Sequence, residues 1–363
     1  MHPRRRRSMA AAAAVWVWVC MSMVAVRSAA DGLEDVPTIA FEEGFSPLFG
    51  EDNMEKSADG RTVSITLNRY TGSGFISSDY YHHGFFSASI KLPKDHTAGV
   101  VVAFYLSNGD VFEKTHDELD FEFLGNRYRH EWKMQTNVYG NGSTDRGREE
   151  RYLMPFDPTA DAHRFSILWS SRLIVFYVDG VPIREVPRSP AMGADYPSKP
   201  MALYVTIWDG STWATDNGKY KVNYKRGPFT AVFSDLVLRG CRARSDIRLA
   251  SVSADEQDRC AAEEEEELMS ASYATMTARK RLAMRRGGGG GGQMLYTVCY
   301  DTNRYPEPFP ECDVNMAERQ MYWQWGESKV VRPRVRPRPG RRSKRRPSPF
   351  PPPPVLVSLQ QAD

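Results

Sequence analysis

The sequence predicts an all-β domain, built as a sandwich or barrel of antiparallel sheets. Between about residues 41 and 238, short aromatic and β-branched runs alternate with turn residues, and no amphipathic helix of ordinary length interrupts them. Strands without helical crossovers favour antiparallel pairing. The clearest strands are expected at Thr62–Leu67, Phe85–Ile90, Val100–Leu106, Phe165–Trp169, Leu173–Val178 and Ala202–Trp208. Asp179-Gly180 is a typical hairpin turn between two strands.

Before this domain, residues 1–30 have the organisation of a secretory signal. A basic stretch, Arg4–Arg7, precedes an apolar run, Met9–Val26, and Ser28-Ala29-Ala30 supplies small residues for cleavage. The apolar run is also about as long as a short membrane span, so an uncleaved anchor is the alternative. We expect a secreted protein whose mature chain begins near Asp31.

Four cysteines remain once Cys20 leaves with the signal: Cys241, Cys260, Cys299 and Cys312. An even number of cysteines in an exported chain favours disulfides over free thiols. Three pairings can be drawn, and the two local ones, 241 with 260 and 299 with 312, are favoured.

The octet 116–123, His-Asp-Glu-Leu-Asp-Phe-Glu-Phe, carries the clearest chemical signal in the chain. With the two-residue period of a strand, Glu118, Asp120 and Glu122 fall on one face and apolar side chains on the other. Stacked carboxylates repel one another, and Asp and Glu are poor strand formers. A sequence tolerates this cost where the chemistry needs the charges. The plain alternative is a solvated acidic face on a half-buried strand.

Glycoside hydrolysis is a reaction that needs such charges. Retaining enzymes place two carboxyl groups about 5–5.5 Å apart around the sugar C1, one as nucleophile and one as proton donor. On a strand, residues 118 and 122 have Cα atoms about 13 Å apart, at about 3.3 Å per residue. Two Glu side chains that lean together close much of that gap, and the shorter Asp120 between them touches both.

The ten residues 116–125, which end in Phe123-Leu124-Gly125, resemble the active-site strand of the plant xyloglucan endotransglucosylase/hydrolases of glycoside hydrolase family 16. The resemblance covers about residues 40–312. It implies a jelly-roll sandwich with a concave sheet at 31–240 and a disulfide-linked extension at 241–312, typical of the long C-terminus branch. It implies action on plant cell-wall xyloglucan, with Glu118 as nucleophile, Glu122 as acid/base and Asp120 as helper. We expect no cofactor, no metal and a monomer.

The same resemblance implies sugar-binding residues beside the octet, Glu122 among them. Gln135-Thr136-Asn137 occupies the place of the family's donor-site amides, with Gln135 and Asn137 on one strand face. Without the resemblance, two amides on a strand would be read as surface decoration. Gly147-Arg148-Glu149 matches a second binding patch, in which the family usually has Asn at the first position. Gly147 therefore offers only its backbone.

A polar, turn-rich stretch at 208–218 holds two tryptophans, Trp208 and Trp213. Tryptophans in such loops serve as core lids or as sugar platforms. The family has Asp-Trp at 212–213 and a Gly shortly after. Here Thr212 replaces the Asp, which weakens that hydrogen-bonding role, while Trp213 and Gly218 are kept.

Asn141-Gly142-Ser143 is the only Asn-x-Ser/Thr sequon in the chain. Many relatives carry a sequon directly after the acid/base, but here that place reads Asn126-Arg127-Tyr128, which does not fit the rule. Asn141 is therefore the candidate glycosylation site, and an unused sequon is the alternative.

After Cys241 the composition changes. An acidic run at 254–267 ends in five consecutive Glu, which is typical of a solvated, mobile segment. Thr275–Arg286 has helical character, and the six glycines Gly287–Gly292 predict a flexible link where relatives continue a helix. Residues 296–300 are expected to form a strand. Arg304, in Arg-Tyr-Pro, matches the family's acceptor-side arginine.

Residues 313–363 are expected to form a disordered, basic tail. From Lys329 it alternates Arg with Pro, and it includes Arg341–Arg346 and Pro351–Pro354. In a cytosolic protein this would suggest nucleic-acid binding, but the signal argues against it. In a cell wall the expected partner is acidic pectin, held by salt-sensitive attraction; a tail without a partner is the alternative.

Three functions from different classes fit the sequence. We favour a retaining enzyme that transfers a xyloglucan chain to a xyloglucan or oligosaccharide acceptor, with hydrolysis by water as the alternative. A non-catalytic glucan-binding module is the second, but binding alone does not require a row of carboxylates. The third is a binding protein that acts through its basic tail, with the β-domain as scaffold.

Overall fold

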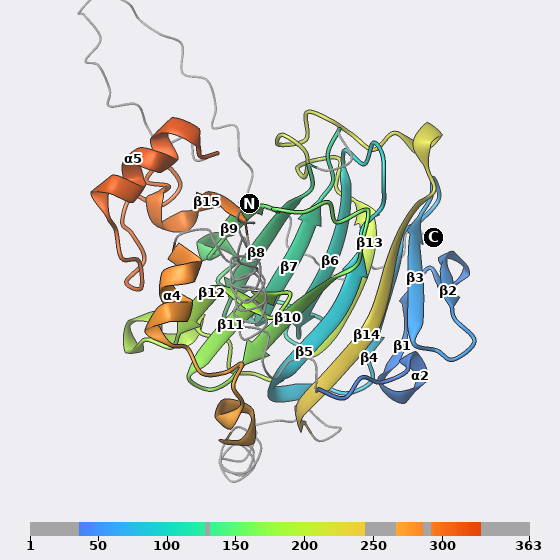
Figure 1. The fold of residues 1–363 in the computed structure, drawn as a ribbon, viewed down its shortest axis with the longest axis horizontal. Coiled ribbons are helices and arrows are strands. Elements are labelled where there is room, and N and C mark those ends of the chain that lie inside the picture. The colour runs from blue at the N-terminus through green and yellow to red at the C-terminus, as the bar shows by residue number, and fades with distance from the viewer. Residues whose placement is uncertain (1–35, 128–130, 244–265, 286–291, 328–363) are drawn as a thin grey trace, which may run out of the picture.

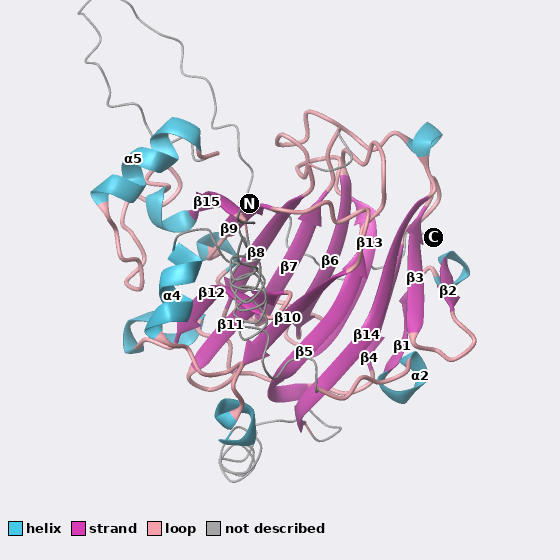
Figure 2. Cartoon of the chain, in the orientation of Figure 1, coloured by secondary structure: helices cyan, strands magenta, loops and turns pink. Residues whose placement is uncertain are grey.

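Two antiparallel β-sheets pack face to face in the computed structural model, which describes residues 36–127, 131–243, 266–285 and 292–327 (Figures 1 and 2). The predicted jelly-roll β-sandwich is confirmed. The predicted signal at 1–30, Cys260 and the tail beyond residue 327 lie outside the described residues. In the part that is described, no helix has the length and apolar character needed to cross a bilayer.

The eight-stranded sheet contains the acidic octet in its interior. In spatial order its strands are β1 (Phe45–Phe49), β4 (Ser73–Ser77), β13 (Ala202–Asp209), β6 (Val100–Ser107), β7 (Glu118–Leu124), β8 (Lys133–Tyr139), β9 (Glu150–Leu153) and β15 (Gln293–Thr297). The strand β7 is therefore bonded on both sides, to β6 and to β8.

The seven-stranded sheet forms the second layer. In spatial order its strands are β12 (Val181–Pro187), β11 (Leu173–Val178), β10 (His163–Trp169), β5 (Tyr81–Lys91), β14 (Phe229–Arg242), β3 (Thr62–Leu67) and β2 (Met54–Lys56). The helical elements are short: α2 (Phe41–Gly44), α4 (Ala278–Arg285), α5 (Met316–Trp325), and the 3₁₀ turns η1 (Glu51–Asn53), η2 (Thr144–Arg146), η3 (Pro190–Asp195), η4 (Tyr224–Arg226) and η5 (Val298–Tyr300).

The expected strands are confirmed. The strands β3 and β11 have the predicted bounds, and β5, β6, β10 and β13 extend one or more residues beyond theirs. The hairpin between β11 and β12 turns at Asp179 (φ 48°) and Gly180 (φ 75°), as the Asp-Gly pair predicts. The strand expected at 296–300 instead covers Gln293–Thr297 and is followed by η5, because pairing with β9 ends at Thr297.

Aromatic packing between the layers fixes which face of β7 is buried. Phe121 contacts Phe165 and Phe176 of the other sheet edge to face, with ring centroids 5.6 and 5.2 Å apart, and Phe123 lies 4.6 Å from Phe165. Each such side chain stabilises the fold by about 1.5–3 kcal/mol when it is fully buried. A one-residue slip of β7 would expose these rings and bury the carboxylates in the core, so the register holds the acidic row outside.

The C-terminal extension is integrated into the sandwich. Its strand β15 pairs with β9, and α4 lies against β12 through a two-bond ion pair of Arg281 with Glu185, 2.7 Å at each bond. The strand β14 runs through the predicted domain boundary at 240 and ends at Arg242. Cys299–Cys312 is a disulfide, as predicted. Cys241 is disulfide-bonded, while its predicted partner lies outside the described residues.

Disorder was expected from residue 313, but Met316–Trp325 forms α5 at the β15 end of the eight-stranded sheet (Figure 1). The Asn315 side chain caps this helix by accepting hydrogen bonds from Ala317 N (2.8 Å) and Glu318 N (3.5 Å). Residues 313–327 lack the Arg-Pro alternation of the tract that follows, so their composition does not exclude a helix.

Candidate active site

The three carboxylates of β7 project from the outer face of the eight-stranded sheet, away from the apolar core. Strand pairing places Ser107, Tyr105 and Ala103 of β6 beside Glu118, Asp120 and Glu122 in turn, and Tyr139, Asn137 and Gln135 of β8 on their other side. The sequence predicted the alternation within β7 and β8. The register between the strands adds Tyr105 and Ser107 to the site.

Glu118 is held in a buried, hydrogen-bonded position. It is only 6 % exposed, and its carboxylate lies 3.9 Å from His116 Nε2. Burial raises the pKa of Glu118 to about 7, against hydrogen bonds from Ser107 and Asp120 that favour the charged form. Burial also lowers the pKa of His116, so this imidazole is neutral near pH 7.

Asp120, between the two glutamates, is the carboxyl that best retains a proton. Burial raises its pKa well above the usual value, and the charges of Glu118 and Glu122 raise it further. A protonated Asp120 donates a hydrogen bond to Glu118, and that bond favours the Glu118 carboxylate. The three carboxyls therefore do not share the negative charge equally, and Asp120 is the one that most favours its neutral form.

Glu122 begins a chain of polar contacts that crosses the sheet. Its Oε2 accepts a hydrogen bond from Gln135 Nε2 at 2.7 Å, and Gln135 Oε1 accepts two from Arg151 at 2.7 and 3.0 Å. Arg151 Nη2 also donates to Glu149 Oε1 at 2.6 Å. Burial raises the pKa of Glu122 to about 7, and the Gln135 hydrogen bond opposes that rise.

Arg304 joins the same chain although it follows the glycine run. Its Nη1 donates to Glu149 Oε2 at 2.8 Å, so Glu149 lies between Arg304 and Arg151. The structure thus brings together Glu122, Gln135, Glu149 and Arg304, as the resemblance implied. Arg151 was not predicted from the sequence. Its position two residues after Glu149 would have indicated that the two side chains share one strand face.

Two of the predicted sugar-binding side chains are buried and bound to other protein groups. Thr136 is fully buried opposite Phe121, and its Oγ1 accepts a hydrogen bond from Arg184 at 2.8 Å. Arg148 is 2 % exposed, paired with Asp195 and Glu311, with its guanidinium over the ring of Phe309. Strand alternation explains why the Thr136 side chain points into the core. Arg148 joins its loop to the segment that ends at Cys312.

Gly147 contributes space to the site. A Cβ at this position would lie 2.7 Å from the ring of Tyr139. The hydroxyl of Tyr139 accepts a hydrogen bond from Asn137 Nδ2 at 2.7 Å. Tyr139 stands beside Glu118 in the register. The missing side chain, where the family usually has Asn, thus leaves room for the Tyr139 ring.

The loop 210–218 lies at the Glu122 end of the row. Trp213 packs with Trp208, ring centroids 6.0 Å apart, against a cluster that includes Leu124, the next outward residue of β7. Gly218 has a φ of 76°, and a Cβ there would meet the Thr212 carbonyl oxygen at 2.2 Å. Gly218 therefore supports the turn, and Thr212 is exposed. Trp213 is half-buried against the cluster that contains Leu124.

Two aromatic rings extend the site on the side opposite Arg304. Tyr105 and Tyr204 stack with centroids 5.1 Å apart and an interplanar angle of 17°. Tyr105 of β6 lies beside Asp120, and Tyr204 of β13 lies beside Tyr105. The sequence showed both residues within predicted strands, but not that β13 pairs with β6, which is what aligns the rings with the carboxylates.

The predicted glycosylation site lies at a turn after β8. Asn141 is exposed with φ 51°, and its backbone N–H donates to the buried Asp117 at 2.7 Å. Exposure is compatible with a glycan, and glycosylation of Asn141 stays a prediction.

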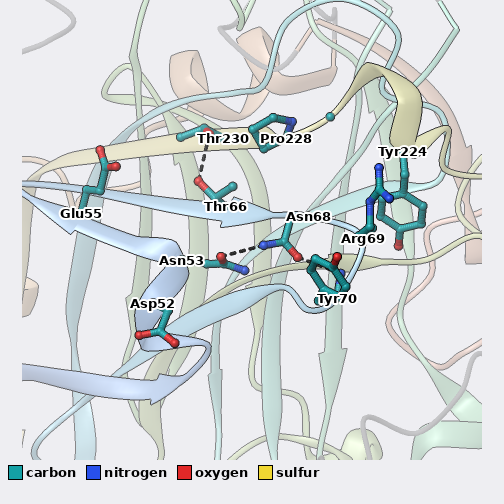
Figure 3. A pocket seen from close by; sticks show the side chains of 11 residues that line it. Asp52, Asn53, Glu55, Thr66, Asn68, Arg69, Tyr70, Tyr224, Pro228 and Thr230 are labelled. Carbon is teal, nitrogen blue, oxygen red and sulfur yellow. Dashed lines mark hydrogen bonds between the residues drawn. The ribbon is translucent and has the colours of Figure 1, made fainter.

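A separate hollow of about 450 Å³ lies near β2 and β3 of the other sheet (Figure 3). Its polar groups largely bind one another: Asn68 Nδ2 donates to Asn53 Oδ1 at 2.8 Å, and the hydroxyls of Thr66 and Thr230 are 2.9 Å apart. None of the β7 carboxylates lines it. The outer face of the eight-stranded sheet is therefore the candidate active site.

This face can perform acid–base chemistry on a neutral polymer. Closely spaced carboxyls with raised pKa values are suited to the proton transfers of glycoside cleavage, and the flanking tyrosines and amides suit sugar rings and hydroxyls. The fold and the site together define a glycosidase-type β-sandwich.

Comparison with known proteins makes the assignment specific. The model of the glycosyl hydrolases family 16 matches residues 41–226. The probable xyloglucan endotransglucosylase/hydrolase protein 30 of Arabidopsis thaliana is 52 % identical over 320 residues, which cover 88 % of this chain and 90 % of that protein. Protein 27 of the same plant is 53 % identical over 302 residues, 83 % and 86 % of the two chains. The chain therefore belongs to glycosyl hydrolase family 16 and, within it, to the xyloglucan endotransglucosylase/hydrolases.

Among solved structures, the Bacillus licheniformis β-glucanase matches with a TM-score of 0.43 and 22 % identity, over 54 % of this chain and 92 % of that one.

Proposed function

We propose that this protein is a secreted cell-wall enzyme that cleaves the β-1,4-glucan backbone of xyloglucan with retention and transfers the cleaved chain to another xyloglucan. The observation that carries the proposal is the row Glu118, Asp120 and Glu122, which shares protons on the outer face of β7. Family membership supports xyloglucan as the substrate, because the relatives are named for action on it.

In the first step, the Glu118 carboxylate attacks C1 of the bound sugar and forms a glycosyl ester. The C1–O bond to the departing chain breaks, and Glu122 gives its proton to that oxygen. Asp120, protonated, donates to Glu118 and holds it toward C1. The raised pKa of Glu122 keeps its proton available near neutral pH.

In the second step, the Glu122 carboxylate takes a proton from the incoming hydroxyl. That oxygen attacks C1, and the bond from C1 to Glu118 breaks, which restores both carboxyls. If the hydroxyl belongs to a sugar, the product is a new glycosidic bond; if it belongs to water, the product is a reducing end.

Transfer requires that a held sugar outcompete water, which is present at about 55 M. Positioned groups reach effective molarities of about 10⁵ M or more, so acceptor subsites can decide the outcome. Arg304, bound to Glu149, and Trp213, beside Leu124, are the residues in position to build those subsites. Their location near the Glu122 end of the row supports transfer over hydrolysis.

The test is a product ratio with xyloglucan and a labelled xyloglucan oligosaccharide. We expect label to enter polymer faster than new reducing ends appear, and we expect Glu118→Ala, a folded control, to show neither. If reducing ends accumulate equally with and without the acceptor, and polymer stays unlabelled, the enzyme is a hydrolase and the transfer assignment is wrong.

A further inference from the structure

The segment after the second disulfide cysteine returns to the edge of the eight-stranded sheet. Glu327 N donates to Leu295 O of β15 at 2.7 Å, and Tyr322 Oη donates to Met294 Sδ at 2.7 Å. The rings of Tyr322 and Tyr300 stack with centroids 5.0 Å apart. Because backbone and side chains both dock α5 and its C-terminal residues, the position of Glu327 is defined by the fold.

Glu327 lies at the end of a row that begins at Glu122. Strand register aligns Glu122 of β7, Gln135 of β8, Arg151 of β9 and Tyr296 of β15 across four neighbouring strands. Hydrogen bonds join the first three members in sequence. The row connects the acid/base to the strand on which Glu327 is docked.

The Glu327 carboxylate completes this row by binding two cations. Its Oε2 accepts a hydrogen bond from Arg151 Nη1 at 2.8 Å, and its Oε1 binds Lys133 Nζ of β8. All three side chains are between 20 % and 28 % exposed, so solvent screens the pairs only in part. Arg151 thus has three acceptors, Gln135, Glu149 and Glu327, which fix its guanidinium.

We propose that Glu327 is a positioning residue for Glu122, since it holds Arg151 in the place from which Arg151 orients Gln135. The inference rests on the proposed function, in which Glu122 gives and takes the reacting proton. Residues beyond Cys312 then help to set the position and the proton affinity of the Glu122 carboxyl.

The charged and titratable groups around Glu122 determine the sign of the effect. Those near Glu122 lie on or beside strands β6 to β9, and those around Arg151 also come from β15, from the loop between Cys299 and Cys312, and from the residues after α5. The groups are Tyr105, Glu118, Asp120, Lys133, Tyr139, Glu149, Arg151, Tyr296, Arg304 and Glu327. The Gln135 hydrogen bond and the charge of Arg151 both lower the pKa of Glu122. Both depend on where Arg151 is held, so the loss of the Glu327 carboxylate should raise the pKa of Glu122, whereas the lost negative charge acting through space alone would lower it.

The experiment compares Glu327→Gln with Glu318→Gln in the full-length protein. Glu318 lies on α5, in the same C-terminal segment as Glu327, and accepts a hydrogen bond from Tyr300 Oη at 2.8 Å, so it is a matched change away from Arg151. In Glu327→Gln we expect the alkaline limb of kcat/KM on xyloglucan to move up by about 0.5–1 pH unit. Turnover should fall about three- to tenfold. The burst of phenol release from an aryl glycoside should stay unchanged, because that leaving group needs no proton.

A second readout does not depend on turnover. The carboxyl of Glu122, labelled with ¹³C and assigned by its loss in Glu122→Gln, is titrated by NMR in both variants. A higher pKa in Glu327→Gln alone supports the proposal. An unchanged or lower Glu122 pKa, or equal behaviour of the two variants, overturns it. Failure of the proposed function is a different result, namely a wild-type protein that does not turn over xyloglucan.

Discussion

At the scale of single residues, the site depends on how three closely spaced carboxyls divide their protons. Glu118, Asp120 and Glu122 cannot all be charged, because burial and mutual repulsion penalise the fully ionised row. Hydrogen bonds decide which carboxyl ionises. Glu118 receives them from Ser107 and Asp120, while Glu122 receives one from Gln135 and faces the charge of Glu149. Glu118 and Glu122 therefore differ in their hydrogen-bond neighbours, although burial raises the pKa of each to about 7.

Replacing Gln135 with Ala tests this view of Glu122. The amide donates to the carboxylate and so lowers the pKa of Glu122; without it, the pKa should rise from about 7. The acid form then persists to higher pH, and the alkaline limb of kcat/KM should move up by about 0.5–1 pH unit. The measurement is a pH profile with xyloglucan. A limb that stays in place would show that Gln135 serves sugar binding alone.

At the scale of elements, the loop between Cys299 and Cys312 carries Arg304 to the site. The disulfide closes this loop, which follows directly from β15 and η5. Within it, Arg304 N donates to Asp301 Oδ1 at 3.1 Å, and Arg148 reaches Glu311 beside Cys312. The covalent link thus limits how far Arg304 can move from Glu149.

Replacing both cysteines with serine should loosen this loop more than the sandwich. Removing a structural disulfide costs about 2–5 kcal/mol. We expect the KM for the acceptor oligosaccharide to rise, while hydrolysis without acceptor keeps most of its rate. The readouts are acceptor kinetics and thermal unfolding, with the reduced wild-type protein as the comparison. Equal losses in both activities would mean that the bridge supports the sheet itself.

The elements also show which features can be predicted from sequence. Local alternation was sufficient for β3, β7, β8 and β11, because each buries one face or both and its pattern is read within a few residues. It could not pair β13 with β6 or β15 with β9, since those contacts join segments far apart in the chain. Tyr204, Arg151 and Glu327 owe their places to such pairings. Helix α5 was missed because its short segment adjoins a strongly biased tail.

At the scale of the whole molecule, one buried cation joins the two sheets behind the active site. Arg184 of β12 in the seven-stranded sheet is 7 % exposed. Its Nη1 donates to Thr136 Oγ1 at 2.8 Å, its Nη2 donates to Arg148 O at 2.6 Å, and its Nε lies 3.3 Å from Glu150 Oε2. All three partners lie in or beside the eight-stranded sheet. The position of Thr136, which does not face the site, is explained by this link.

Arg184→Met should therefore destabilise the entire sandwich. Met keeps most of the apolar volume but removes the cation beside Glu150, which keeps only the hydroxyls of Tyr152 and Thr297. It also leaves the Thr136 hydroxyl and the Arg148 carbonyl without the guanidinium, and we expect a total cost of about 3–5 kcal/mol. Arg188→Met is the matched control, because Arg188 belongs to the same region but is exposed. The measurement is urea unfolding of both variants. Since the charge of Arg184 also lowers the pKa of Asp120, its loss should strengthen the hold of Asp120 on its proton. Equal unfolding midpoints for the two variants would show that the apolar core alone joins the sheets.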